Sequence, residues 1–107
     1  AGGHLTAFRR MDGAFLGSID VAIKKANSSI LFQMNSEAIF DFCKPGAQAP
    51  GLERSNGGLM PFGGGIPLFD DGGTMIGAIG VSGGAVVQDV EVAEAGRDAL
   101  DAVLRAA

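Results

Sequence analysis

The sequence predicts a single α+β domain over residues 1–107, because stretches with helical apolar periodicity alternate with the pattern of a β-hairpin. A chain of 107 residues is long enough to bury one core and too short for two domains. Hydrophobic residues make up 47% and charged residues 19% of the chain, which is the composition of a folded protein rather than a disordered one.

The first predicted element is a strand over His4–Met11, where apolar and polar residues alternate imperfectly. Asp12 is then predicted to cap a helix. Apolar residues follow one side of that helix at spacings of three and four: Phe15, Ile19, Ala22, Ile23, Ala26 and Ile30. Adjacent residues on a helix point in different directions, so at most one of Lys24 and Lys25 is expected to face any single pocket.

A second, short helix is predicted over Ser36–Phe42, with Ser36 as its cap and Pro45 just beyond its end. The next stretch, Lys44–Gly65, is rich in Pro and Gly and therefore predicts a long loop. Loops of this length in compact domains are commonly functional or disordered.

The stretch "GIPLFDDGGTMIGAIGVSGG" predicts two strands joined by the turn Asp70–Gly73, whose Asp and Gly residues suit a tight hairpin. A final helix is predicted over residues 86–107. Its apolar stripe, interrupted at Arg97, consists of Val90, Ala93, Leu100, Val103 and Leu104.

Composition argues against several kinds of partner. A net charge of −4, from 8 basic and 12 acidic residues, offers no positive surface for nucleic acid or anionic lipid. No apolar run reaches the roughly 18 residues of a membrane helix, so we expect a soluble, cytoplasmic protein, or a secreted one if a signal peptide was removed. The single cysteine, Cys43, allows no internal disulfide and no Cys-cluster metal site, and we expect it to be a free, buried thiol.

The residues Gly80–Gly84 match G-x-S-x-G, the pattern of a hydrolase nucleophile elbow. No histidine follows Ser82, and His4 lies far upstream, so we expect a strand-to-helix turn rather than a nucleophile. Two alternatives stay open for this turn. The backbone amides of Gly83 and Gly84 could hold a carboxylate or phosphate at the helix start, or the glycines permit close packing against a helix or another subunit.

Four stretches, in order along the chain, resemble the GlcG/HbpS family: "RRMDGA" (Arg9–Ala14), "KKA" (Lys24–Ala26), "FGGGIPLFDDGGTMIGAIGVSGG" (Phe62–Gly84) and "QDVEVAEAG" (Gln88–Gly96). The resemblance implies a profilin-like domain, with a five-stranded antiparallel sheet flanked by helices in three layers, assembled into homo-oligomers. Members of the family bind or respond to haem, a related domain forms the C-terminal part of PduO-type adenosyltransferases, and others are encoded beside genes for glycolate, glycerol or propanediol use. Family members also have a leading helix and a first strand before the turn that here is Ala1–Gly3, and we expect these to be missing.

The polar and Gly positions of the family motifs are occupied here by Arg10, Asp12, Lys25, Gly64, Gly65, Ser82 and Asp89. All of these except Asp12, together with Gly83 from the turn at the helix start, are the seven candidate ligand-binding residues. These candidates are Arg10, Lys25, Gly64, Gly65, Ser82, Gly83 and Asp89. The axial haem ligand of the family has no assigned counterpart in this sequence, although His4, Cys43 and the Met residues are candidates by residue type.

Three functions compete at this point. The favoured one is a binding module that holds haem, or a related apolar and anionic ligand, at the Gly-rich loop and a subunit interface. The second is a small enzyme or accessory protein acting on a hydroxy acid or diol-derived compound. Arg10 or Lys25 would pair with the carboxylate of the substrate, and Asp89 would be the acid or base. The simpler alternative is that Arg10 and Asp89 form an ordinary structural ion pair. The third is a structural subunit of a larger assembly.

Overall fold

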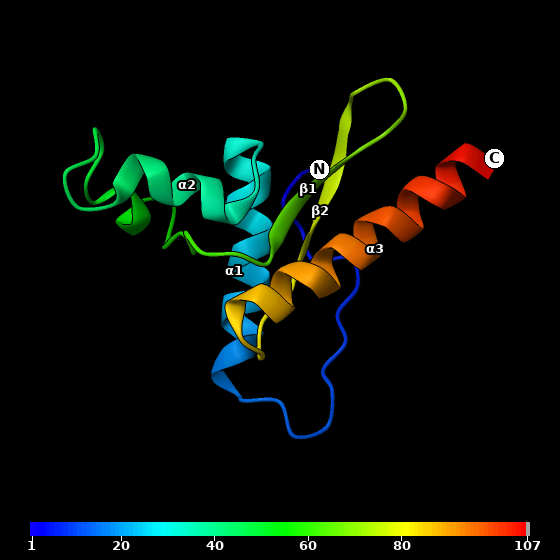
Figure 1. The fold of residues 1–107 in the computed structure, drawn as a ribbon, viewed down its shortest axis with the longest axis horizontal. Helices are drawn as coiled ribbons and strands as arrows, with labels where there is room; N and C mark the ends of the chain where they lie inside the picture. Colours follow the sequence, from blue (N-terminus) through cyan, green and yellow to red (C-terminus); the bar gives the residue numbers. More distant parts are fainter. Residues whose placement is uncertain (107) are drawn as a thin grey trace.

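The computed structural model describes residues 1–106 and has a β-hairpin at its centre (Figure 1). The elements are α1 (Gly17–Phe32), α2 (Ser36–Cys43), the short 3₁₀-helix η1 (Leu52–Arg54), β1 (Gly65–Phe69), β2 (Met75–Gly80) and α3 (Val86–Ala106). The α+β class, the second helix, the long loop and the final helix are thereby confirmed. The predicted cap of the second helix is wrong, because Asn35 is the N-cap of α2 and Ser36 is its first helical residue, whose hydroxyl bonds the loop instead. Ala107, which the predicted final helix included, lies outside the described residues.

The hairpin forms as predicted. Strand β1 pairs antiparallel with β2, with Gly65 opposite Gly80 and a register irregularity between Leu68 and Phe69. Asp70 closes the turn, because its Oδ1 accepts hydrogen bonds from the backbone N–H groups of Gly72 and Thr74, each at 2.9 Å.

The two long helices cover opposite faces of the hairpin. A Cβ atom added to Gly80 would collide with the backbone of α1 at Ala22 and Ala26, so this residue faces α1. Its neighbour Ile79 points to the other face, where its Cδ1 would lie 2.6 Å from a Cβ atom on Gly96 of α3. The result is three layers, with α3 crossing the hairpin in Figure 1. Of the five strands that the family resemblance implies, residues 1–106 contain the two of the hairpin.

The core is small and partly polar. Its buried apolar residues are Ile39, Cys43, Leu59, Ile66 and Ala93, and its buried polar residues are Lys25, Ser28, Ser29, Ser36 and Asp89. Helix α1 therefore buries a lysine and two serines against the sheet, while the predicted stripe residues Ile19, Ile23 and Ile30 are only half-buried. Because glycines line the facing strands, small and polar side chains on α1 allow the backbones to approach closely.

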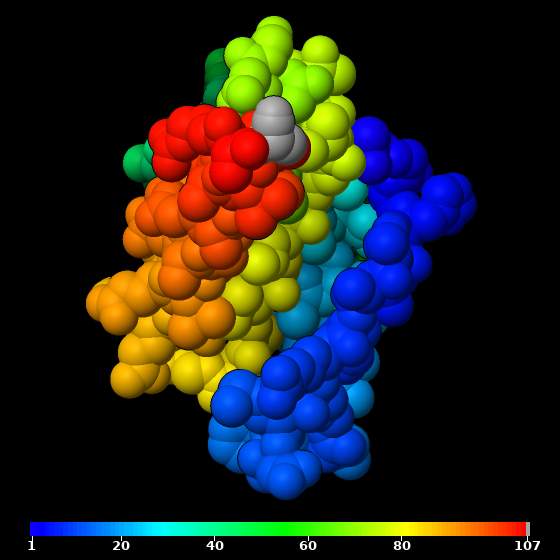
Figure 2. All heavy atoms as spheres, turned by 90° about the vertical axis from the view of Figure 1, so that its right-hand side faces the viewer, coloured from blue at the N-terminus to red at the C-terminus, as the bar shows by residue number. Residues whose placement is uncertain are grey.

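The predicted strand over His4–Met11 is wrong. All eight residues are exposed and irregular, and Figure 2 shows the N-terminal segment running over the surface. A strand requires a partner for its backbone hydrogen bonds. Within residues 1–106 the sheet contains β1 and β2 alone, and the N-terminal amine reaches it only through a 3.3 Å hydrogen bond to the Ile76 carbonyl.

Two local predictions for the helices are also wrong. Asp12 does not cap α1, because a turn closed by a 3.1 Å hydrogen bond from Ala14 N to Met11 O delays the helix until Gly17, and Phe15 is left 75% exposed. In α3, Val103 is 65% exposed and points away from the core.

Candidate functional site

Lys25 lies at the centre of the sequence-predicted site. Its side chain is fully buried, and Nζ donates to the Val81 carbonyl at 2.8 Å and to Asp89 Oδ2 at 3.1 Å. The ammonium group also lies 4.7 Å from the centroid of the Phe62 ring, a cation–π contact. One lysine therefore joins α1, the long loop, the turn after β2 and the start of α3.

Side chains of α3 accept hydrogen bonds from the backbone N–H groups just before the helix. Asp89 Oδ1 accepts from the backbone N–H of Gly84 at 3.0 Å, and Gln88 Oε1 accepts from that of Ala85 at 3.0 Å. Both side chains thereby take amide hydrogens that an incoming carboxylate or phosphate would need. The geometry favours the packing alternative for this turn over an anion site.

Gly64 and Gly65 serve close packing. A Cβ atom on Gly64 would collide with the Val81 carbonyl oxygen and lie 2.9 Å from Lys25 Nζ, and one on Gly65 would collide with the Lys25 carbonyl. Gly64 also has a φ of +131°, which a residue with a side chain rarely adopts. The space above both glycines is thus filled by the chain itself.

The structure brings together Lys25, Gly64, Gly65 and Asp89 from the predicted set, and it places Arg10 elsewhere. Arg10 is exposed and donates to the Ala14 carbonyl at 3.4 Å. The predicted Arg10–Asp89 ion pair is wrong, because Asp89 pairs with Lys25.

The two adjacent lysines do point in different directions, as expected. Lys25 enters the core, whereas Lys24 forms a surface ion pair with Asp20 at 3.0 Å. The sequence could not show which lysine turns inward.

Ser82 and Gly83 lie in the turn between β2 and α3, half-buried and exposed respectively. This confirms the strand-to-helix turn. Within residues 1–106 no hydrogen bond joins Ser82 to His4, which is itself exposed. The serine therefore has no activating base, and the hydrolase interpretation gains no support.

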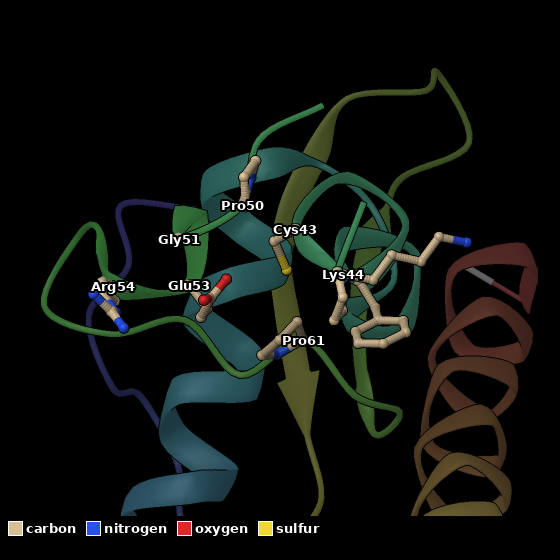
Figure 3. Close-up of a pocket in the computed structure, with 9 residues that line it drawn as sticks. Cys43, Lys44, Pro50, Gly51, Glu53, Arg54 and Pro61 are labelled. Carbon is tan, nitrogen blue, oxygen red and sulfur yellow. The ribbon is translucent and has the colours of Figure 1, made fainter. Parts of the chain in front are cut away.

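A different region provides an open hollow of about 550 Å³. We name it the α2 hollow, and it is lined by Phe40, Cys43, Lys44, Pro45, Pro50, Gly51, Glu53, Arg54 and Pro61. Figure 3 shows the Cys43 sulfur and the Glu53 carboxylate pointing toward one another between helix α2 and the loop. A second, apolar hollow of about 380 Å³ shares Phe40 and Pro61 with it and reaches Phe62, Gly63 and Val86.

Cys43 is a free thiol and only 7% exposed, as predicted. Burial, and then a hydrogen bond to Glu53 and the charge of that carboxylate, raise the pKa of the Cys43 thiol. The pKa of Glu53 is lowered, first by its own backbone N–H and then by the thiol. Glu53 Oε2 is buried and has no hydrogen-bond partner of its own among the described residues, although the thiol and neighbouring backbone N–H groups stabilise the carboxylate as a whole.

Two cations stand at the edges of the α2 hollow. Lys44 pairs with Asp41 at 3.7 Å, while the exposed Arg54 has no ion-pair partner in the part of the chain that the structure describes. In Figure 3 their side chains lie on opposite sides of the thiol. Apolar walls with cations at the rim suit a flat or apolar ligand that carries acidic groups.

None of the seven predicted ligand-binding residues lines the α2 hollow. The only signal for it in the sequence is the long Pro- and Gly-rich loop, which was expected to be functional or disordered. Two buried serines fold that loop back. Ser28 Oγ accepts from Met60 N at 3.0 Å, and Ser36 Oγ donates to the Phe62 carbonyl at 2.6 Å and accepts from Gly65 N at 2.9 Å.

The described residues contain no group of three or more His, Cys, Asp or Glu side chains arranged to hold a metal ion. Among the same residues, no helix has the length and apolar character to cross a membrane.

Comparison with known proteins decides the family. The model of a family described as "Haem degrading protein HbpS-like" matches residues 1–98. The chain belongs to the HbpS-like family. A 15.0 kDa protein from the dhaT–dhaS intergenic region of Citrobacter freundii is 40% identical over 98 residues, which cover 91% of this chain and 68% of that protein. The corrinoid adenosyltransferase PduO of Salmonella typhimurium is 39% identical over 95 residues, which cover 88% of this chain but only 28% of PduO.

Three solved structures agree with the fold. Protein ORFY of Klebsiella pneumoniae matches with a TM-score of 0.87 at 37% identity, over 91% of this chain and 67% of that one. A complex of PduOC with haem matches with a TM-score of 0.85 at 38% identity, over 91% of this chain and 70% of that one. A double mutant of HbpS from Streptomyces reticuli matches with a TM-score of 0.73 at 32% identity, over 86% of this chain and 60% of that one. The HbpS-like fold and the overall antiparallel α+β architecture are therefore shown.

Proposed function

We propose that this protein is a haem-binding module and that the α2 hollow receives the porphyrin. The observation that carries the proposal is the likeness to PduOC, which was solved in complex with haem. The PduOC chain is 38% identical to this chain, and the two structures match with a TM-score of 0.85. The family description, which names haem, supports the same ligand. Haem supplies a redox-active iron whose properties depend on its axial ligand and its surroundings.

The residues of the α2 hollow fit such a ligand. Its volume of about 550 Å³ lies within the roughly 300–1,000 Å³ typical of small-molecule sites. Phe40 and three prolines provide apolar walls, Arg54 provides a cation for a propionate, and Cys43 provides a soft donor.

The geometry gives less support to the small-enzyme hypothesis. An acid–base pair must reach a substrate, but Lys25 is fully buried and Asp89 is 5% exposed. Asp89 is already engaged through both of its oxygens. These two residues hold the fold together, and we assign no chemistry to them.

We also infer that the protein self-associates, as the family resemblance implies. Fifteen large hydrophobic side chains are exposed among the described residues, whereas the large ones that are buried are Ile39, Leu59 and Ile66. Patches of exposed apolar surface are typical of protein–protein contacts.

A titration of the purified protein with hemin tests the proposal. We expect a Soret band that saturates at one hemin per chain. Arg54→Ala is expected to weaken binding about 2- to 5-fold, the effect of one exposed charge contact. Arg105→Ala, which removes the same charge from the last turn of α3, is the matched control and should bind like the wild type. A Soret region that does not change at stoichiometric hemin would contradict the proposed function.

A further inference from the structure

We infer that Phe40 contacts the ring of the bound porphyrin, and that the ligand extends from the α2 hollow into the neighbouring apolar hollow of about 380 Å³. We name that space the second hollow. The inference rests on the proposed function and adds to it the side chains that recognise the ring. Phe40 and Pro61 line both spaces, and both spaces are open. A flat ligand that covers these two side chains would therefore reach into the space on either side of them.

Helix α2 holds the base of Phe40 and leaves its ring at the surface. Ser36 and Cys43, four residues before it and three after it on the same side of the helix, are buried. Phe40 itself is 46% exposed, so a large part of an apolar side chain remains in contact with water. A flat aromatic ligand that covers Phe40 removes this area from water and adds a contact between aromatic rings.

The second hollow has apolar walls that are fixed by α1 and α3. The ammonium group of Lys25 lies 4.7 Å from the centroid of the Phe62 ring and holds that ring from the inside. Gly63 lies against α3, because a Cβ atom there would be 2.5 Å from Val90 Cγ2 and 3.1 Å from Val86 Cγ1. Phe62 and Val86 are nevertheless partly exposed. The second hollow thus offers ordered apolar surface to the apolar edge of a porphyrin.

Charged side chains indicate which edge of the ligand lies on which side. The α2 hollow is lined by two cations, Lys44 and Arg54, and by one carboxylate, Glu53. Glu37 is the one charged residue among the described residues that line the second hollow, and its Oε1 accepts a 3.3 Å hydrogen bond from Asn35 Nδ2. Cations attract a propionate and a carboxylate repels it. We therefore expect the acidic edge of haem beside Arg54 and the apolar edge in the second hollow.

Two phenylalanines of the same helix test the contact with the ring. Phe40→Ala should weaken hemin binding by about 2- to 12-fold, the range for one aromatic contact. Phe42→Ala is the matched control, because Phe42 is 38% exposed on α2 and lines neither hollow. Its hemin affinity should equal that of the wild type. Circular dichroism in the far ultraviolet checks that both variants keep their helices.

Two adjacent valines at the start of α3 test the extension into the second hollow. Val86 lines that hollow, whereas Val87 is 68% exposed and lies outside both hollows. Val86→Glu places in the second hollow a charge that the ligand would have to desolvate, so hemin binding should weaken by about 5-fold or more. Val87→Glu adds the same charge next to it and should leave the affinity unchanged.

Metal-free protoporphyrin separates contacts with the ring from contacts with the iron. It should bind the wild type, and the losses in Phe40→Ala and Val86→Glu should reappear with it, because both side chains are assigned to the ring. Its own fluorescence reports binding, and the chain contains no Trp or Tyr that would add to the signal. Losses that occur with hemin but not with metal-free protoporphyrin would arise at the iron and would overturn the inference.

The remaining outcomes distinguish this inference from the proposed function. No hemin binding by the wild type defeats both together. Hemin binding with equal affinities within the Phe40 and Phe42 pair, or within the Val86 and Val87 pair, leaves the proposed function standing and overturns the assigned ring contacts. If Phe40→Ala does not fold, the valine pair decides alone. Selective losses in Phe40→Ala and Val86→Glu with both ligands support the inference.

Discussion

Lys25 and Lys24 are neighbours in the sequence with opposite environments. Burying an ammonium group is costly unless it is paired and hydrogen-bonded. Lys25 meets this condition through the Val81 carbonyl and Asp89, whereas Lys24 lies at the surface beside Asp20. The two positions therefore differ in what they contribute to stability.

Lys25→Met is expected to lower the free energy of unfolding by about 3–5 kcal/mol, because it leaves the buried Asp89 carboxylate without its cation. Lys24→Met removes an exposed ion pair between residues four apart and should cost about 0.3–0.5 kcal/mol. Urea denaturation of the two variants measures the difference. Equal losses would show that the buried pair contributes no more than the surface one.

Some of the candidate site could be predicted from individual residues, and some could not. The adjacent lysines of "KKA" were predicted to point in different directions, and they do, with Lys25 turned into the core. The α2 hollow could not be predicted, because it depends on Ser28 and Ser36, whose hydroxyl groups hold the loop from inside the core. Serines in helices are ordinarily solvent-facing, so sequence alone gives no reason to bury them.

At the scale of elements, the hairpin and α1 are in contact through their backbones. Gly80 lies against Ala22 and Ala26 with no room for a Cβ atom. On the opposite face, Gly96 of α3 lies under Ile79 in the same way. The spacing between the three layers is thus set by glycines rather than by interlocking large side chains.

Gly80→Ala is expected to destabilise the protein by about 1–3 kcal/mol, because the added methyl group must push β2 away from the α1 backbone. Gly77→Ala on the same strand is the matched control, since nothing lies within 4 Å of its Cβ position, and its change should stay within about 0.5 kcal/mol. Thermal unfolding followed by circular dichroism compares them. An unfolding temperature that is the same for both variants would contradict this account of the packing.

Elements specified by local sequence were predicted well. The turn Asp70–Gly73 fixes its hairpin through Asp70 itself, and α3 follows its own periodicity. The strand over His4–Met11 was predicted wrongly, because alternation describes a strand only where another strand accepts its hydrogen bonds. The start of α1 was missed for a local reason, since the turn closed between Met11 and Ala14 carries the chain past Asp12.

At the scale of the whole molecule, two segments carry many of the exposed apolar side chains. One is the N-terminal segment, where Leu5, Met11, Phe15 and Leu16 are each more than 60% exposed. The other is the outer side of α3, with Val92 at 58% and Val103 at 65% exposure. Figure 2 shows these two segments on the same side of the molecule, with the hairpin and α1 visible between them.

Light scattering coupled to size exclusion is expected to give a mass at least twice the 10.8 kDa of one chain, because association would cover this apolar surface. Val103→Lys on α3 and Phe15→Lys in the N-terminal segment identify which surface is used, since a charge at the contact should shift the population toward monomer. A single species at 10.8 kDa for the wild type would contradict the inferred self-association.

The Ser36 hydroxyl has a consequence for evolution as well as for stability. It joins the end of the long loop to the start of α2 through Phe62 and Gly65, so the loop leaves and returns at nearly the same point. A loop closed in this way can gain or lose residues at its far side at little entropic cost. The walls of the hollow can therefore change from one relative to another while the hairpin and the helices beneath them keep their positions.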